Sequence, residues 1–301
     1  MSRPRPRGSA EYALWGLATL GLAAPARAGL RYTVVTEDSH GDQSAAVVEA
    51  EGERIRVEFR ERGGAMFGRG DFLTTEDGGE TIYWVEPKKK RYAQVDFDRL
   101  ARMMGRILQG IPGVFWVRIE EPQVRKVFEE VGPELLGLPT RHARYLMTYR
   151  DRSRLTLPAR HGVESTRQET WNHVVQDVWT TDAVEAPRHD FWLRDRIRSG
   201  YEDLDRLLDA EASMLHGFPL RVETVTAAAT RDLDYTRVRL ESDRHSVTQQ
   251  FYLGSAASQR QIDYTRTASE VTALASTSEP IDAERFRPPA GFKKTEPRSG
   301  R

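Results

Sequence analysis

Hydrophobic and polar residues alternate along most of the chain after residue 29, and this alternation predicts antiparallel strands. At residues 55–60, Ile55, Val57 and Phe59 share one side of the segment, and charged residues occupy the positions between them. A period of two residues is typical of a strand with one buried face and one face in water. The same reasoning predicts further strands at residues 30–36, 72–75, 81–85, 91–95, 144–149, 168–179, 220–225, 236–240 and 246–253.

Turn signals between these segments predict hairpins. The Asp-Gly pair within residues 76–79 separates two predicted strands, and Pro87 begins the turn into the next one. Consecutive hairpins of this kind make a meander. The polar stretch at residues 151–166 predicts a long hairpin excursion.

The period of the apolar positions changes at residues 97–109, where it predicts an amphipathic helix. Asp96 is placed to cap the start of this helix, and Gly110 and Pro112 end it. A second helix is predicted at residues 201–215. Residues 124–131 stay open between helix and strand, because their apolar spacing fits a helix but Gly132 and Pro133 follow closely.

The predicted fold class is therefore α+β, mainly antiparallel β. No linker rich in Pro, Gly and Ser divides the chain, so we expect a single domain at residues 29–292 and a polar C-terminal tail at residues 293–301. The 301 residues carry 45 basic and 45 acidic side chains and no cysteine. This balance argues against a polybasic nucleic-acid arm, and the absence of cysteine excludes disulfide scaffolds and thiol nucleophiles.

The first 28 residues predict a signal peptide for export to the periplasm. Arg3, Arg5 and Arg7 precede an apolar run at residues 13–24, and Ala26-Arg27-Ala28 supplies a cleavage site. As a helix this run would span only about 18 Å, which is too short for a bilayer core. We expect at most peripheral membrane contact from the mature chain.

Charged and polar motifs give weak signals for chemistry. The glycines of residues 63–70 are not followed by Gly-Lys-Ser/Thr, which favours a hairpin loop over a phosphate loop. The basic residues 88–91 fit a solvated hairpin tip better than an anion site. Seven histidines show no zinc-site spacing, and no Gly-x-Ser-x-Gly elbow is present. The acids Glu164, Glu169 and Asp177 could face one another across a hairpin, as in a hydrolase.

The remaining candidate site is apolar, and we expect no cofactor and no metal in it. Its members are Trp84, Leu100, Met103, Met104 and Ile107. A helix face rich in methionine adapts to ligands of variable shape, which suits lipid or acyl-chain binding. Core filling under the helix is the alternative, and the residues alone favour it.

Several segments together resemble the periplasmic lipoprotein-carrier (Lol-type) superfamily, especially its exported relatives. Besides the signal peptide and the helix from Phe97, the segments that carry the resemblance are residues 51–58 (EGERIRVE), 77–87 (DGGETIYWVEP) with Tyr92, 137–142 (GLPTRH), 217–224 (GFPLRVET) and 286–294 (FRPPAGFKK).

The resemblance implies an antiparallel sheet curled into a half-open barrel, with helices across its concave face. In the carriers the apolar cavity between them shelters lipoprotein acyl chains, and we carry over this architecture but no individual functional residue. We therefore expect a non-enzymatic binding protein for a lipid, an acylated protein or another apolar ligand, with residues 97–109 as a lid over Trp84. An envelope structural or protein-interaction module without a ligand cavity is the alternative.

Overall fold

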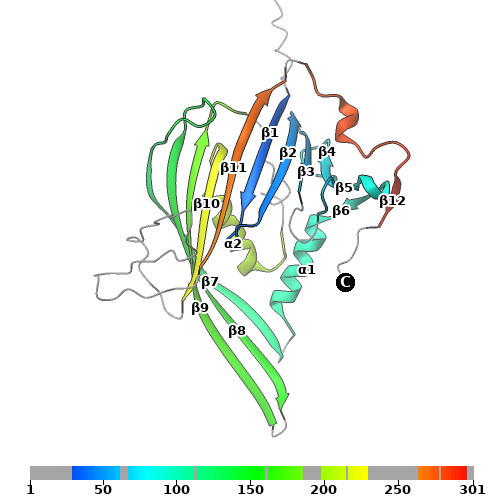
Figure 1. Ribbon diagram of the computed structural model, residues 1–301. Helices are drawn as coiled ribbons and strands as arrows, with labels where there is room; N and C mark the ends of the chain where they lie inside the picture. The colour runs from blue at the N-terminus through cyan, green and yellow to red at the C-terminus, as the bar shows by residue number, and fades with distance from the viewer. Residues whose placement is uncertain are drawn as a thin grey trace, which may run out of the picture.

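The computed structural model describes residues 29–61, 67–111, 114–159, 162–185, 198–214, 216–229, 264–277 and 279–296. Within these ranges the strands are β1 (Leu30–Glu37), β2 (Gln43–Glu51), β3 (Arg54–Phe59), β4 (Phe72–Thr75), β5 (Ile82–Glu86), β6 (Arg91–Val95), β7 (Phe115–Val131), β8 (Arg141–Ala159), β9 (Gly162–Thr181), β10 (Phe218–Ala229), β11 (Tyr264–Ser276) and β12 (Lys293–Thr295). They form one open sheet in the order β12-β6-β5-β4-β3-β2-β1-β11-β10-β9-β8-β7 (Figure 1).

The predicted meander is confirmed in strands β1 to β6, which lie side by side in sequence order. Strand β2 was not predicted, because the run of four apolar residues at 45–48 breaks the alternation. The turn after β5 is a short 3₁₀ helix, η1 (Pro87–Lys89), and Lys90 ends it with a φ of 46°. The basic residues 88–91 therefore lie at a hairpin tip, as expected.

The second half of the sheet contains the long predicted hairpin, formed by β8 and β9. Figure 1 shows these two strands running past the rest of the sheet to the bottom of the view. Strand β7 pairs along β8; the sequence left its residues 124–131 open between helix and strand, and its residues 115–123 were not predicted. Strand β11 pairs with β1 on one side and β10 on the other, so it joins the two halves. The strands predicted at residues 236–240 and 246–253 lie outside the described residues.

Three residues of the expected polar tail belong to the sheet. Strand β12 pairs with β6, and this pair is parallel, whereas the other neighbouring strands are antiparallel. Just before it, the short 3₁₀ helix η5 (Ala283–Phe286) buries Phe286 completely. The hydroxyl of Thr74 donates a hydrogen bond of 2.8 Å to the Phe286 carbonyl. The end of the described chain is therefore held on strands β4 and β6 of the meander.

Two α-helices complete the described fold. Helix α1 (Phe97–Gln109) has the predicted bounds, and the carboxylate of Asp96 caps it by accepting a hydrogen bond of 2.7 Å from the Arg99 backbone N–H. Helix α2 (Glu202–Ala212) is shorter than predicted at both ends. Among the described residues, none of the helices is long and apolar enough to span a membrane.

Apolar side chains gather on one face of the sheet. Val48, Val57 and Leu73 are aligned across β2, β3 and β4, and all three are fully buried. They belong to a first core cluster, against which Phe97 at the start of α1 also packs. A second core cluster lies on β8 and β9, and α2 covers it. The second cluster contains Ala143, Tyr145, Met147, Val174, Val178 and Met214, with Leu207 and Ala210 of α2 packed against it.

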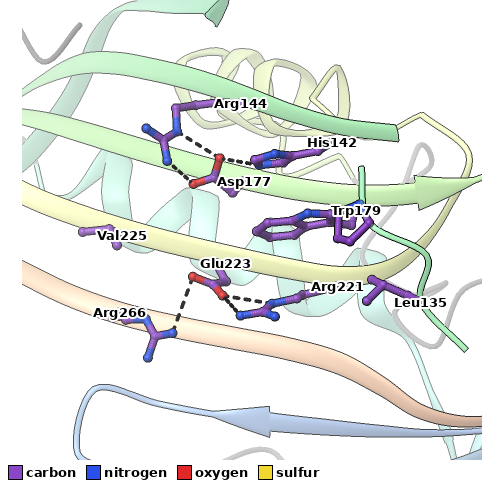
Figure 2. A pocket seen from close by; sticks show the side chains of 10 residues that line it. Leu135, His142, Arg144, Asp177, Trp179, Arg221, Glu223, Val225 and Arg266 are labelled. Carbon is purple, nitrogen blue, oxygen red and sulfur yellow. Dashed lines mark hydrogen bonds and ion pairs between the residues drawn. The ribbon is translucent and has the colours of Figure 1, made fainter. Parts of the chain in front are cut away.

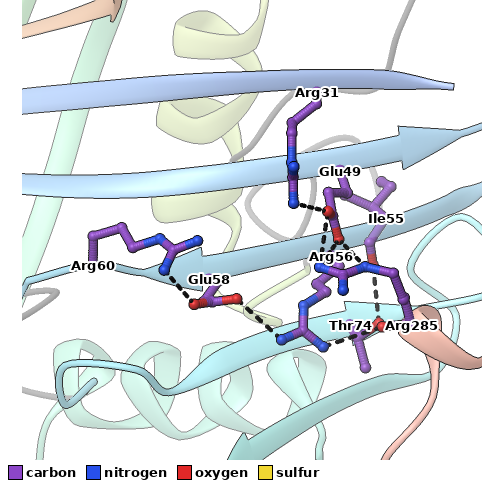
Figure 3. A network of polar contacts seen from close by, with 8 residues as sticks. All are labelled: Arg31, Glu49, Ile55, Arg56, Glu58, Arg60, Thr74 and Arg285. Carbon is purple, nitrogen blue, oxygen red and sulfur yellow. Dashed lines mark hydrogen bonds and ion pairs between the residues drawn. The ribbon is translucent and has the colours of Figure 1, made fainter. Parts of the chain in front are cut away.

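The opposite face of the meander is polar because its residues alternate with those of the core. Glu49, Arg56 and Thr74 are aligned on this face, and Figure 3 shows the ion pairs that surround them. The buried carboxylate of Glu49 accepts hydrogen bonds of 2.6 Å from Arg31 and of 2.8 Å from both Nε and Nη2 of Arg285. Arg285 precedes Phe286, so this network also holds the C-terminal segment on the sheet.

Candidate functional site

Trp84, the predicted site residue on the sheet, is half-buried against the first core cluster. Its indole N–H donates a hydrogen bond of 3.2 Å to Asp71 Oδ2, and the Phe67 ring meets its edge at 5.4 Å. The polar atom of the indole is therefore already satisfied within the protein, which leaves its apolar surface for packing.

The other predicted site residues lie on α1. Met103 is 42% exposed and Ile107 is 53% exposed, whereas the side chains of Leu100 and Met104 lie outside what the structure describes. Phe97 and Trp84 pack against the same core cluster, so the start of the helix and the indole lie on the same face of the sheet. Met103 and Ile107 thus bring apolar side chains of α1 to the surface.

The opposite face of β8, β9 and β10 carries a polar pocket of about 280 Å³ (Figure 2). Asp177 in this pocket alternates along β9 with Val178 of the second core cluster, which places the pocket on the other side of the sheet from that cluster. The pocket is lined by Pro133, Leu135, His142, Arg144, Asp177, Trp179, Arg221, Glu223, Val225 and Arg266.

Strand register brings two carboxylates together in the pocket. Arg144, Asp177 and Glu223 are directly opposite one another across β8, β9 and β10. Like charges in such a position repel each other. Arg144 offsets this on one side, because it donates to both oxygens of Asp177 at 2.9 and 2.7 Å. Glu223 pairs with Arg221 and, at 3.5 Å, with Arg266.

A second row of side chains stacks beside the carboxylates. His142 Nε2 lies 3.0 Å from Asp177 Oδ1, and the imidazole lies parallel to the Trp179 ring with centroids 4.3 Å apart. The guanidinium of Arg221 lies 5.0 Å from the Trp179 centroid. His142 and Arg221 thus both contact the indole, so the carboxylates, the histidine and the aromatic ring are all engaged with neighbours.

None of the ten residues that line this pocket has a hydroxyl or thiol group that could act as a nucleophile. The expectation that Glu164, Glu169 and Asp177 could face one another across a hairpin is wrong. All three residues lie on β9, and Glu169 pairs instead with Arg152 at 3.0 Å. Within the described ranges, no group of three or more His, Asp or Glu side chains is arranged to hold a metal ion.

Two partly buried groups that can lose a proton, Tyr149 and Asp151, lie near α2 on the apolar side of the sheet. Tyr149 packs against the second core cluster, and burial together with the charges of Asp151 and Glu211 raises the pKa of this tyrosine to about 12. Burial also raises the pKa of Asp151, although the nearby Asn172 amide opposes the shift. Protons are therefore held more tightly here than on an exposed carboxylate.

The polar pocket was missed by sequence reasoning, although a local signal existed. Polar residues alternate at 142 and 144 and at 221 and 223, and Asp177 alternates with Trp179. Each pair marks a polar strand face, but their meeting depends on the register between strands that are far apart in the sequence.

Comparison with known proteins does not assign this chain to a family. No protein-family model matches the chain, and no curated protein matches it. A solved structure of PNGF-II, in the C2 space group, shows some similarity, with a TM-score of 0.33 and 9% sequence identity over 90% of this chain and 31% of that chain. This chain thus spans about a third of the length of that protein, and so distant a similarity indicates neither family nor function.

Proposed function

We propose that this chain is an exported, non-enzymatic binding protein for a lipid or another apolar ligand. The observation that carries the proposal is the exposure of Met103 and Ile107 on α1. Both belong to a strongly amphipathic helix whose first residue, Phe97, packs on the core. A ligand that covers such side chains gains about 25 cal/mol for each Å² of apolar area removed from water.

The architecture proposed for this function is a half-open barrel with helices across its concave face. Its support is that both core clusters, Phe97 of α1 and the apolar residues of α2 share one side of a single sheet. The segments that resemble the Lol-type carriers lead to the same proposal. A partly covered apolar face of this kind suits a chain-like ligand better than a small polar one.

The proposed ligand contacts are Leu100, Met103, Met104 and Ile107 on the helix and Trp84 on the sheet. Methionine side chains are unbranched and polarisable, so they adapt to acyl chains of different length. Such a site requires no catalytic group, cofactor or metal, since affinity comes from hiding apolar area.

Replacement of Ile107 by Asp tests this site, because it places a charge where the ligand would lie. Since Ile107 is exposed, the fold should survive, whereas affinity for the apolar dye Nile red should fall by about tenfold or more. Val131→Asp is the matched control, because this residue is 91% exposed at the end of β7, far along the sheet from α1. Equal dye binding by the wild type and Ile107→Asp would contradict the proposal.

The alternative is an envelope interaction module with a filled core and no ligand cavity. The tight packing of the first core cluster favours it, since Val48 and Leu73 are fully buried and Trp84 already has a hydrogen-bond partner. Dye binding separates the two functions: a filled core would bind little dye in the wild type and in both variants.

A further inference from the structure

Exposed apolar side chains concentrate at one end of the molecule. Among the described residues, eight large hydrophobic side chains are exposed, and five of them lie on α1, in the segment that follows it, and on the outer part of β8. These five are Met103, Ile107, Ile111, Val114 and Leu155. Scattered surface apolar residues are ordinary, but a cluster of them marks an interaction surface.

Backbone hydrogen bonds make part of this cluster contiguous. Ile111 and Phe115 exchange hydrogen bonds of 2.8 and 3.0 Å, and the Thr156 N–H donates to the Val114 carbonyl at 2.7 Å. Phe115 is also directly opposite Leu155 in the β7–β8 pair. We call Ile111, Val114 and Leu155 the distal patch: Ile111 and Leu155 are both paired with Phe115, and Val114 is the residue before it, where β8 runs beyond the body of the sheet.

The segment at residues 97–118, which contains α1, Ile111 and Val114, has a net charge opposite to that of the rest of the sequence. Residues 97–118 carry four Arg and one Asp, whereas the rest of the sequence carries 41 basic and 44 acidic side chains. The guanidinium of Arg106 bonds a backbone carbonyl, and that of Arg118 lies 5.5 Å from the Trp116 centroid. Beside the patch on β8, the guanidinium of Arg154 bonds the Ser165 hydroxyl. These neutral partners do not offset the positive charges of the three arginines.

We propose that the distal patch and its arginines dock the protein on an anionic lipid bilayer. Aliphatic side chains enter the interface between headgroups and acyl chains, arginines pair with anionic headgroups, and Trp116 is a residue type that prefers this interface. Charge complementarity selects the bilayer as the occupant, because an uncharged apolar partner would not require a basic rim. The inference rests on the proposed function, to which it adds the surface from which a lipid is taken or delivered.

Vesicle co-sedimentation tests the docking directly. The protein, purified without detergent, should bind vesicles of phosphatidylcholine and phosphatidylglycerol at least about tenfold more tightly than phosphatidylcholine alone, and added salt should reduce this preference. Ile111→Ser with Leu155→Ser should weaken binding by about tenfold. Arg106→Gln with Arg154→Gln should weaken binding to the anionic vesicles by about fivefold for each arginine removed.

The matched control is Val127→Ser with Val131→Ser, which removes two exposed valines from the opposite end of β7 and should leave vesicle binding unchanged. Absence of vesicle binding by the wild type, or an equal loss in the control pair, would overturn the docking proposal. Nile red binding measured without vesicles keeps the two proposals apart. If the wild type does not bind vesicles but Ile107→Asp loses Nile red binding, the docking proposal is wrong and the ligand site stands. If the vesicle results are as predicted but Ile107→Asp binds Nile red as the wild type does, the ligand site is wrong and the docking surface stands.

Discussion

Asp151 illustrates how burial acts on single side chains of this sheet. It lies on β8 close to Tyr149 and Asn172, and Glu211 of α2 also contributes to the charge around Tyr149. Partial burial penalises its ionised form and raises its pKa. By contrast, Glu49 and Asp177 on the polar face accept hydrogen bonds from arginines. The carboxylates of the polar face thus have arginine partners, whereas burial disfavours the ionised form of Asp151 on the other face.

Replacement of Asp151 by Asn should make stability less dependent on pH. Because the pKa of Asp151 is raised on folding, the folded state holds the proton more tightly, and stability falls as pH rises from about 4 through the folded-state pKa. The variant should therefore have a higher Tm than the wild type at pH 7 and no advantage at pH 3. Thermal unfolding at both pH values checks this, with the exposed Glu134→Gln as control. A lower Tm for the variant at pH 7 would contradict it.

Helix α1 is held in position at its start, middle and end. A Cβ atom added to Gly105 would lie 2.4 Å from the Ser199 carbonyl oxygen, and Gln109 Nε2 donates a hydrogen bond of 3.1 Å to the Gly200 carbonyl. The segment before α2 therefore fixes the middle and end of α1, whereas Phe97 fixes its start. This arrangement leaves the exposed side chains of Met103 and Ile107 accessible to a ligand.

Gly105→Ala tests the contact between α1 and Ser199. The substitution has two opposing effects on the free energy of unfolding. Higher helix propensity alone would stabilise the protein by about 1 kcal/mol. The clash with Ser199 should outweigh it, so we expect a net loss of about 1–3 kcal/mol in the free energy of unfolding, measured by urea denaturation. A gain in stability would mean that α1 does not press on this segment.

Elements that depend on residues close together in the sequence were predicted, whereas elements that depend on the register between paired strands were not. Helix α1 was predicted to the residue because its apolar period and the Asp96 cap are local. Strand β7 stayed open because its pairing with β8 shifts register twice, between Glu120 and Gln123 and between Lys126 and Phe128. Each irregularity interrupts the period of two that identifies a strand.

The same distinction applies to the sites. The apolar residues of α1 were identified from their spacing within one helix. The polar pocket joins Arg144, Asp177 and Glu223, which are separated by more than thirty residues at each step. No local pattern reports which strands become neighbours, so a site that depends on pairing between distant strands escapes sequence reasoning.

At the scale of the whole molecule, three surfaces have separate chemical character. One face of the sheet is apolar and bears both core clusters, the other carries the ion-pair networks of Figures 2 and 3, and the outer end combines the distal patch with arginines. The ligand site that we propose belongs to the apolar face and the docking surface that we propose belongs to the outer end, whereas the polar face carries the ion pairs and the pocket of about 280 Å³.

Native mass spectrometry of the protein, purified from its own cells without detergent and followed by lipid extraction, tests the central claim most directly. We predict a species heavier than the polypeptide by the mass of a lipid or acylated peptide, which the extraction then identifies. The added mass should disappear in Ile107→Asp and persist in Val131→Asp. A wild-type protein that carries only the polypeptide mass would contradict the claim that this chain holds an apolar ligand.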